Sequence, residues 1–580
     1  MLNEFVSLSR KGEAVWIADV RAAFAADKTA RPLVARLECL DGSVRDYSFA
    51  LPIWSTAAER SFVLDYLTAG VFNILSCCSG RTLTLCLDAG DDELVRLAQD
   101  CLASFASVPG LRKVLNIAAR LCRGMGCGAF KMQLACTGQY PPAEPLQKTS
   151  GGQLGESLRA AVQRCMSGAY CGIDVGGTDI KLAVSLDGRL LAVKEYDWNP
   201  AASPTAGGIT GPVLLLARLM RACVIVDGLP ADCAPAGALA AALRKDADHA
   251  EMEAAAAACE SAAETLPLFS GIGLSFPDVV INNRILGGGT PKTKGMRENA
   301  ALDYETEFGK LGDIGASLAR LCAPEGRVRI INDGPMAAFS AAAELAQSGD
   351  AELGTRGVVA HSLGTDLGTG WIEAGGAIPS IPLELYDLLL DLGSEPWKKY
   401  DPSDLRSVRN ENSGLAGVRR YLGQAAAYRM AQLLEPELLR GFTAERDGVI
   451  SVITSPEDLR KPCLEHLMNA ATAGDEPARE IFRRIGVNLA QLTREMEHIL
   501  HTGTDSRFLF GRFAKRPECF GLIKQGFASV IPDMELFAAD DGLARSALMS
   551  QLRQRGGVTV AQFAQAIGAI YYSAMQEDKP

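Results

Sequence analysis

The chain has 580 residues, of which 48% are apolar and 22% are charged, and its net charge is −11 with a pI near 5.2. This balance excludes a disordered or collagen-like chain, and it disfavours binding to nucleic acid or to anionic membranes because an acidic surface repels phosphates. At about 100 to 200 residues per domain, the length predicts about three domains.

The first residues show no basic-then-apolar export signal, and two arginines, Arg218 and Arg221, interrupt the most apolar helical run, residues 211–226. We therefore expect no membrane association and a cytoplasmic location. The sixteen cysteines are scattered through the chain, and without an export signal they are expected to be reduced thiols rather than a disulfide framework.

Residues 1–165 are predicted to form a separate α+β region that begins with strand-like segments. A hairpin is expected to turn at Asp41 and Gly42, a helix to follow Ser55, and the segment RTLTLCL to form a strand before a further helix with acidic leading residues. The polar, Pro- and Gly-rich stretch 137–156 is the best candidate for a linker. From residue 170 onward strands and helices alternate, which favours an α/β architecture.

The segment GIDVGGTDIKLAV, residues 172–184, has the pattern strand, glycine turn, strand. Backbone N–H groups of Gly176 and Gly177 are able to face phosphate oxygens, and Thr178 and Lys181 supply further donors. Asp174 precedes the turn and is a candidate for holding Mg²⁺ through water. A structural turn explains the two glycines equally well. The pattern is neither a Walker loop nor the GxGxxG of a dinucleotide-binding fold.

The segment VRIINDGPMAAFSAAAEL, residues 328–345, places Asn332 and Asp333 between an apolar strand and an alanine-rich helix. A carboxylate at such a strand end is well placed to take a proton from an attacking hydroxyl, and Asn332 beside it is able to fix that hydroxyl. The segment alone favours the alternative that Asp333 only caps the helix.

A second strand, turn and strand follows in GVVAHSLGTDLGTGWIEAGGAI, residues 357–378, with Gly364, Thr365 and Gly368 at or near its turn. Two such loops are expected where two related lobes hold one phosphate tail between them. The segment SRFLFGRFAKRP, residues 506–517, ends an apolar strand at Gly511, where an adenine would lie flat on the backbone. By itself this last segment says almost nothing about function.

Taken in order, these segments resemble the ROK family of sugar kinases and sugar-responsive repressors. GIDVGGTDIKLAV is similar to the family's first phosphate loop, GIGLSFPDVV (271–280) to its GIGxPGP-type strand, and INDGPMAAFSAAAEL to its N-D-A-N-A-A-A-x-x-E segment. SLGTDLGTGW is similar to the second phosphate loop, and FLFGRF to the strand near the adenosine. The resemblance covers about residues 170–580.

The resemblance implies an α/β, two-lobed actin-like or ribonuclease H-like ATPase fold with an additional α+β N-terminal domain. It implies a domain at 1–165, a first lobe at 166–345 and a second lobe at 346–580, whose last helix packs back on the first lobe. Binding of the acceptor is then expected to bring the two lobes together and to exclude water.

The function implied is phosphoryl transfer from Mg²⁺-ATP to the hydroxyl of a sugar or sugar-like acceptor. Asp333 would then be the general base, Asn332 would orient the acceptor, and Asp174 would assist Mg²⁺ through water. The residues implied to hold the ATP phosphates and adenosine are Gly176, Gly177, Thr178, Lys181, Gly364, Thr365, Gly368 and Gly511.

The acceptor side departs from the family pattern. Many ROK proteins carry a G-E-x-G-H segment and a cysteine cluster that completes a zinc site, but residues 380–402 contain no histidine, and no cysteine lies between Cys322 and Cys463. We therefore expect no structural zinc, and only Glu384 suggests the family's sugar-contacting Glu-His pair. In GGGTPKTKGM, residues 287–296, Thr290 and the two lysines either hold a polar or anionic acceptor or form a solvated surface loop.

Two alternatives to a sugar kinase stay open. A repressor would need a basic N-terminal helix-turn-helix, whereas residues 1–150 are nearly charge-balanced. A non-catalytic sugar-sensing regulator or scaffold on the same fold would use the N-terminal domain for assembly, because fold does not fix function. A polyol or nucleoside acceptor and a homodimer are also compatible with the sequence.

Overall fold

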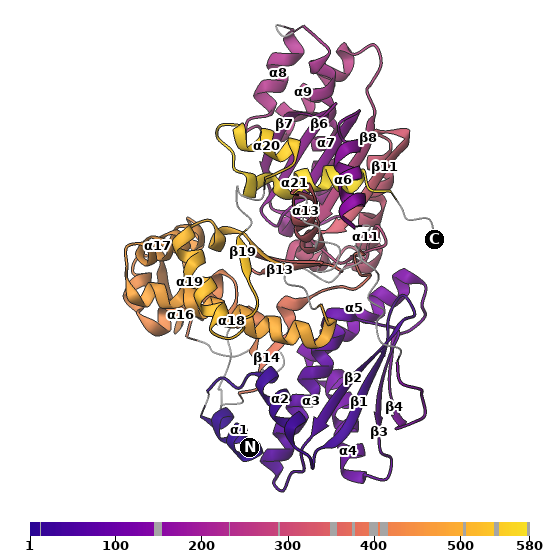
Figure 1. The fold of residues 1–580 in the computed structure, drawn as a ribbon. Helices are drawn as coiled ribbons and strands as arrows, with labels where there is room; N and C mark the ends of the chain where they lie inside the picture. The colour runs from indigo at the N-terminus through magenta and orange to yellow at the C-terminus, as the bar shows by residue number, and fades with distance from the viewer. Residues whose placement is uncertain are drawn as a thin grey trace.

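The computed structural model describes residues 1–11, 13–143, 154–230, 233–287, 291–348, 357–373, 377–393, 404–406, 416–502, 506–538 and 544–576. Figure 1 shows an N-terminal domain in indigo, a first lobe in purple and magenta, and a second lobe in orange. The yellow C-terminal helices return to the first lobe. Part of the predicted linker, residues 144–153, lies outside the described residues.

The N-terminal domain is built on a four-stranded sheet with the order β2-β1-β3-β4. The predicted hairpin is confirmed: β1 pairs antiparallel with β2, and Gly42 supplies the positive φ of 88° that the turn requires. The expectation of strands at the very start is wrong, because two helices come first. The elements are α1 (Leu2–Arg10), α2 (Ile17–Ala26), β1 (Arg31–Glu38), β2 (Val44–Leu51), α3 (Ala57–Cys78), β3 (Thr82–Leu87), α4 (Asp92–Ser107), α5 (Pro109–Met125) and β4 (Lys131–Cys136).

The first lobe is built on a five-stranded sheet with the order β11-β8-β5-β6-β7. β5, β6 and β7 form an antiparallel meander, and β8 and β11 run parallel to β5. The strands are β5 (Ala169–Val175), β6 (Asp179–Leu186), β7 (Arg189–Asp197), β8 (Phe269–Phe276) and β11 (Cys322–Asn332). The other elements are α6 (Leu154–Arg164), α7 (Gly207–Asp227), α8 (Ala234–Ala242), α9 (His249–Ala262), β9 (Val280–Ile281), β10 (Arg284–Ile285), α10 (Lys294–Glu298), α11 (Tyr304–Gly309) and α12 (Ile314–Ala319).

Both faces of this sheet are covered, so its central strands β5 and β8 are buried along almost their whole length. Ile173 of β5 packs with α7 and α9, while Tyr170 packs with the C-terminal helix α21 (Val560–Ser573). α21 comes so close that a Cβ on Gly172 would stand 1.8 Å from the carbonyl oxygen of Ala566. Glycine is therefore required where this helix lies on the strand.

The second lobe repeats this pattern in a four-stranded sheet with the order β13-β12-β18-β19. β12 and β13 form an antiparallel hairpin, and β18 and β19 run parallel to β12; among the described residues this sheet has no counterpart of β7. After the connecting helix α13 (Asp333–Gln347), the main elements are β12 (Val358–Leu363), β13 (Leu367–Ile372), α18 (Glu476–Leu500), β18 (Arg507–Phe510), α19 (Pro517–Ala528) and β19 (Leu536–Ala538). Two sheets of this order, joined through α13, confirm the two-lobed ribonuclease H-like fold.

Smaller elements complete the second lobe and lead back to the first. They are β14 (Leu389–Asp391), β15 (Ala416–Gly417), α15 (Val418–Tyr421), α16 (Gln424–Leu434), β16 (Thr443–Arg446), β17 (Val449–Val452), α17 (Arg460–Thr472) and α20 (Ala547–Gln554).

The N-terminal domain and the second lobe share one hydrophobic core. Buried residues between 2 and 114 and between 359 and 536 belong to the same packed cluster, while helix α6 packs into a core that holds residues of both lobes. The ranges 1–165, 166–345 and 346–580 stay a proposal about domain organisation. The shared core implies that the first range does not move independently of the third.

Among the described residues, α3 and α7 are long and apolar enough to cross a membrane by length and composition. The protein itself buries 83% of the apolar window of α3 and 67% of that of α7. α3 fills the core shared by the N-terminal domain and the second lobe, and α7 covers the first sheet. Their apolar faces are thus already used inside the fold.

Candidate active site

The first glycine loop is the tight turn between β5 and β6. The backbone N–H of Gly176 donates to the carbonyl of Asp179 at 2.8 Å, and the indole N–H of Trp198 donates to the carbonyl of Gly176 at 3.1 Å. Gly177 and Thr178 at the tip are exposed. The turn is thus braced from β7 while its tip is open to a ligand.

Asp174 and Lys181 face each other across the β5–β6 pair, just below this turn. Ser275 at the end of β8 donates its hydroxyl to Asp174 at 2.8 Å, and Lys181 forms an ion pair with Asp179. Burial raises the pKa of Asp174 to about 6, against the lowering effects of Lys181 and Ser275. The negative charges of Asp333 and Asp179 raise this pKa further. Ser275 of β8 lies opposite both Asp174 of β5 and Ile331 of β11, so Asp174 and Asp333 stand at the same edge of the sheet.

Asn332, and not Asp333, caps helix α13. Its side-chain oxygen accepts from the backbone N–H of Gly334 at 2.9 Å, and its amide donates to the carbonyl of Asp278 at 2.8 Å. Asp333 is the first helical residue, with its side chain 38% exposed and its carboxylate 4.0 Å from the ammonium of Lys292. Because the cap is already supplied, capping alone does not explain Asp333.

The two lobes meet directly behind Asp333. A Cβ on Gly334 would stand 2.1 Å from the carbonyl oxygen of Thr369, and one on Gly370 would stand 1.9 Å from the carbonyl oxygen of Gly334. The start of α13 is therefore pressed against β13 backbone to backbone. This contact fixes the position of Asp333 relative to the second glycine loop.

The second glycine loop is the turn between β12 and β13. Its Gly364 donates to the carbonyl of Asp366 at 3.0 Å and accepts from the backbone N–H of Gln424, the first residue of α16, also at 3.0 Å. Thr365 is exposed at the tip, and Gly368 pairs with Ser362 across the hairpin. As in the first loop, hydrogen bonds hold the base of this turn while its tip is exposed to solvent.

Gly511 follows β18 and supports the second loop from the side. Its φ is +97°, and a Cβ there would stand 2.3 Å from the carbonyl oxygen of Leu363. The fold itself therefore requires glycine at this position, whether or not adenine lies on it. Nearby, burial lowers the pKa of Lys515, and the positive charges of Arg512, Lys461 and Lys181 contribute to this lowering.

Glu384 is buried and is held by the N-terminal domain. Its backbone N–H donates to the carbonyl of Ser76 at 3.2 Å, and the Ser76 hydroxyl donates back to the carbonyl of Glu384 at 3.0 Å. Burial raises the pKa of Glu384 to about 8; Asp387 and Asp278 raise it further, and Lys113 opposes them. Glu384 thus lies within electrostatic reach of Asp278, the residue that accepts from Asn332.

This raised pKa predicts a stability that depends on pH. In the unfolded chain a glutamate titrates near about 4.3, so between that pH and about 8 only the folded state keeps the proton on Glu384. The stabilisation that protonated Glu384 contributes to the folded state is complete below about pH 4.3. It is lost as the pH rises from there through 8, by up to about 1.4 kcal/mol per pH unit.

We expect Glu384→Gln, which stays neutral, to match the wild type in thermal unfolding at pH 5 and to be more stable at pH 8.5. If the thermal unfolding midpoints of Glu384→Gln and the wild type differ by the same amount at pH 5 and at pH 8.5, Glu384 is already ionised in the folded protein at pH 5. Asp447→Asn, a surface substitution on the β16–β17 turn, serves as the control and should show no such trend.

Thr290 lies outside the described residues. Sequence reasoning gave no role to Ser275 or Asp278, although both lie in the GIGLSFPDVV segment that ends β8 at the site. The sequence signal that could have identified these two residues is their position at the carboxyl end of β8, a buried parallel strand that lies between β5 and β11.

The part of the chain that the structure describes holds no group of three or more His, Cys, Asp or Glu residues arranged to bind a metal ion. Asp174 nevertheless fits Mg²⁺ bound together with a substrate, because Mg²⁺ keeps several waters and often takes one or two carboxylates plus phosphate oxygens. Burial is the main cause of the raised pKa of its carboxyl, and the negative charges of Asp333 and Asp179 add a smaller effect that a bound cation would offset.

No protein-family model matches the sequence, and no curated protein matches it. Solved structures do match. A ROK family glucokinase from Streptomyces griseus, in complex with glucose and AMPPNP, is 16% identical with a TM-score of 0.36, over 70% of this chain and 98% of that one. The ROK hexokinase from Thermus thermophilus is 17% identical with a TM-score of 0.36, over 70% and 97%.

A ROK family transcriptional regulator, a homologue of the E. coli MLC protein, is 12% identical with a TM-score of 0.39, over 89% of this chain and 99% of that one. The matches thus include both sugar kinases and a regulator. Since every one of these three has an identity below 25% and a TM-score below 0.5, the fold assigned above rests on the strand order of the two sheets.

Proposed function

We propose that this chain is a ROK-type, ATP-dependent carbohydrate kinase that phosphorylates a hydroxyl of a sugar or a sugar-like acceptor in the cytoplasm. The observation that carries the proposal is the placement of Asp333. Its carboxylate stands where the start of α13 meets β13, at the same edge of the first sheet as Asp174 below an open glycine turn, while Asn332 serves as the helix N-cap.

In the proposed reaction Asp333 accepts the proton of the acceptor hydroxyl as its oxygen attacks the terminal phosphorus of ATP. Asn332 orients that hydroxyl. An amide has two N–H donors and room for two hydrogen bonds at its oxygen. Among the described residues Asn332 uses one of each, for Asp278 and Gly334, which leaves one of each for the acceptor.

The phosphates of ATP lie between the two glycine loops in this proposal. The backbones of Gly176, Gly177, Gly364 and Gly368 face them, with Thr178, Lys181 and Thr365 as further donors, and the adenosine lies near Gly511. When bound, Mg²⁺ supplies charge neutralisation between the phosphate oxygens. The role of Asp174 is to hold the waters of that ion.

Glu384 is assigned to the acceptor side, because it interacts with Asp278 and Asp278 is bonded to Asn332. A protonated carboxyl is a hydrogen-bond donor, so a neutral Glu384 suits a hydroxyl or carbonyl oxygen of the acceptor. Thr290 is proposed to belong to the same side.

A test of the proposal is ADP release from Mg²⁺-ATP over a panel of hexoses, amino sugars, polyols and nucleosides. We expect release that depends on one class of acceptor and saturates with it. Binding of ATP without acceptor-dependent release from any member of the panel would favour the alternative, a non-catalytic sugar-sensing regulator or scaffold.

A further inference from the structure

Lys292 occupies a position between the two groups that the proposed reaction must bring together. It lies in a short helical turn, Pro291–Thr293, on the acceptor side of the first lobe. Its ammonium is 4.0 Å from the carboxylate of Asp333, and its Cε is 3.3 Å from the point where a Cβ on Gly177 would stand. The lysine stem thus passes the tip of the first glycine loop and ends at Asp333.

This position is partly shielded from water. The side chain of Lys292 is 28% exposed, compared with 61% for Lys294 two residues later, which pairs with Glu298 on the surface. An ion pair of 4.0 Å at this exposure contributes only about 0 to 1 kcal/mol to stability. The fold therefore has little need of a cation here.

The turn that carries Lys292 is fixed from behind by buried contacts. Thr293 is 2% exposed, its hydroxyl lies 3.0 Å from the hydroxyl of Tyr304, and Arg297 donates to it at 2.7 Å. A Cβ on Gly295 would stand 2.6 Å from the carbonyl oxygen of Ser203, so the following backbone is also closely packed.

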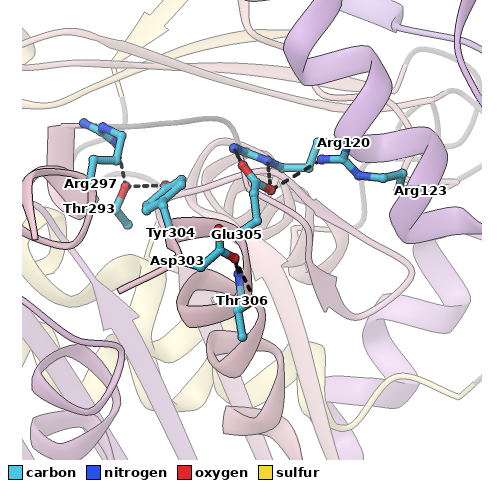
Figure 2. A network of polar contacts seen from close by, with 8 residues as sticks. All are labelled: Arg120, Arg123, Thr293, Arg297, Asp303, Tyr304, Glu305 and Thr306. Atoms are coloured by element: carbon cyan, nitrogen blue, oxygen red, sulfur yellow. Dashed lines mark hydrogen bonds and ion pairs between the residues drawn. The ribbon is translucent and has the colours of Figure 1, made fainter. Parts of the chain in front are cut away.

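The N-terminal domain supports the same turn through α11. Figure 2 shows Arg120 and Arg123 of α5 reaching Glu305, the neighbour of Tyr304. Arg120 donates to Glu305 at 3.1 Å and Arg123 at 3.4 Å, and the Arg120 guanidinium lies 5.6 Å from the centre of the Tyr304 ring. The position of Lys292 is thus set before a ligand binds, which is what charge stabilisation in a transition state requires.

We propose that Lys292 is a catalytic residue whose ammonium contacts the phosphoryl group in transfer. This inference rests on the proposed kinase function. The bond between the acceptor oxygen and the terminal phosphorus forms, the bond from that phosphorus to the β,γ-bridging oxygen breaks, and the acceptor proton goes to Asp333. Lys292 keeps its proton throughout, and its charge offsets the charge on the phosphoryl oxygens and the leaving ADP.

The test compares Lys292→Met with Lys310→Met in the full-length chain. Lys310 is an exposed lysine of the same lobe that pairs with Glu307 at 2.6 Å, so the control removes a closer ion pair away from the site. For Lys292→Met we expect kcat to fall about 10²- to 10³-fold. We expect Lys310→Met to stay within about twofold of the wild type, as for most surface substitutions.

A binding measurement separates this inference from the proposed function. Calorimetry with ATP and with ADP should show that Lys292→Met weakens binding of ATP while ADP binds as before, because only ATP carries the terminal phosphoryl group. Lys292→Arg, which keeps the charge, should restore much of the preference for ATP.

If the wild type binds both nucleotides but phosphorylates no acceptor, the proposed kinase function is wrong. The difference between its affinities for ATP and ADP then still tests whether Lys292 contacts the terminal phosphate. An unchanged preference in Lys292→Met, a wild type without any preference, or equal losses for ATP and ADP would each overturn the inference. An unchanged kcat in Lys292→Met would overturn it as well.

Discussion

Asp333→Asn is expected to lower kcat by about 10³-fold, because an amide cannot accept the proton of the acceptor hydroxyl. The replacement has the same shape and keeps an oxygen that can accept from the backbone N–H of Gly334, as the carboxylate does at 3.0 Å. The only described ion pair of Asp333 is the contact of 4.0 Å with Lys292, so its loss should leave thermal stability nearly unchanged. Steady-state kinetics with the best acceptor, together with ATP binding, measures this effect.

The matched control for Asp333→Asn is Asp313→Asn. Asp313 is an exposed aspartate of the same lobe at the start of another helix, where it is the N-cap residue of α12 and makes no side-chain capping bond. Its substitution should leave kcat within about twofold of the wild type. If both variants lose activity equally, or if neither does, Asp333 is not the general base.

Gly370→Ala is expected to have the largest effect on stability. A Cβ at residue 370 would stand 1.9 Å from the carbonyl oxygen of Gly334, which belongs to the backbone and cannot rotate away as a side chain can. Relief requires β13 and the start of α13 to separate, at a cost of about 3 kcal/mol. Thermal and urea unfolding measure the loss.

Gly368→Ala is the control for this prediction, since it lies two residues away on the same strand. A Cβ there would stand 3.7 Å from the nearest described atom, a Cβ of Ser362, which is an ordinary contact. We expect its unfolding midpoint to stay close to that of the wild type. Similar losses in the two variants would mean that the close contact between the lobes does not limit the stability of the fold.

The sequence predicted those parts of the fold that depend on local patterns. The hairpin at Gly42 was predicted from a turn between two alternating segments, and the β5–β6 hairpin from strand, glycine turn and strand. The two-lobed fold was predicted from the order in which the ROK-like motifs follow one another along the chain. Asp174 and Asp333 were both named, and the structure places both at the same edge of the first sheet.

What the sequence could not give are contacts between distant segments. Asn73 of α3 bonds both the N–H and the carbonyl of Leu389 in β14, at 2.7 and 2.9 Å, so the N-terminal domain holds the segment of Glu384. No sequence pattern within either segment predicts this contact, because the partner atoms on Leu389 are backbone atoms, which every residue carries. Similarly, the capping role was assigned to Asp333 as an alternative, while the structure gives it to Asn332.

The segment around Gly511 illustrates a second limit. A glycine at a strand end has the same sequence signal whether a ligand or another strand approaches it. Here the carbonyl of Leu363 and a φ of +97° account for the glycine. Contact with adenosine at this position therefore stays a proposal that needs its own evidence.

The central claim is the transfer of phosphate to an acceptor, and mass spectrometry of the acceptor panel after incubation with Mg²⁺-ATP tests it most directly. The account predicts a phosphorylated product from one class of sugar or polyol, formed by the wild type and not by Asp333→Asn. ATP that binds to the protein without phosphorylating any acceptor, or a product formed equally by both proteins, would contradict it.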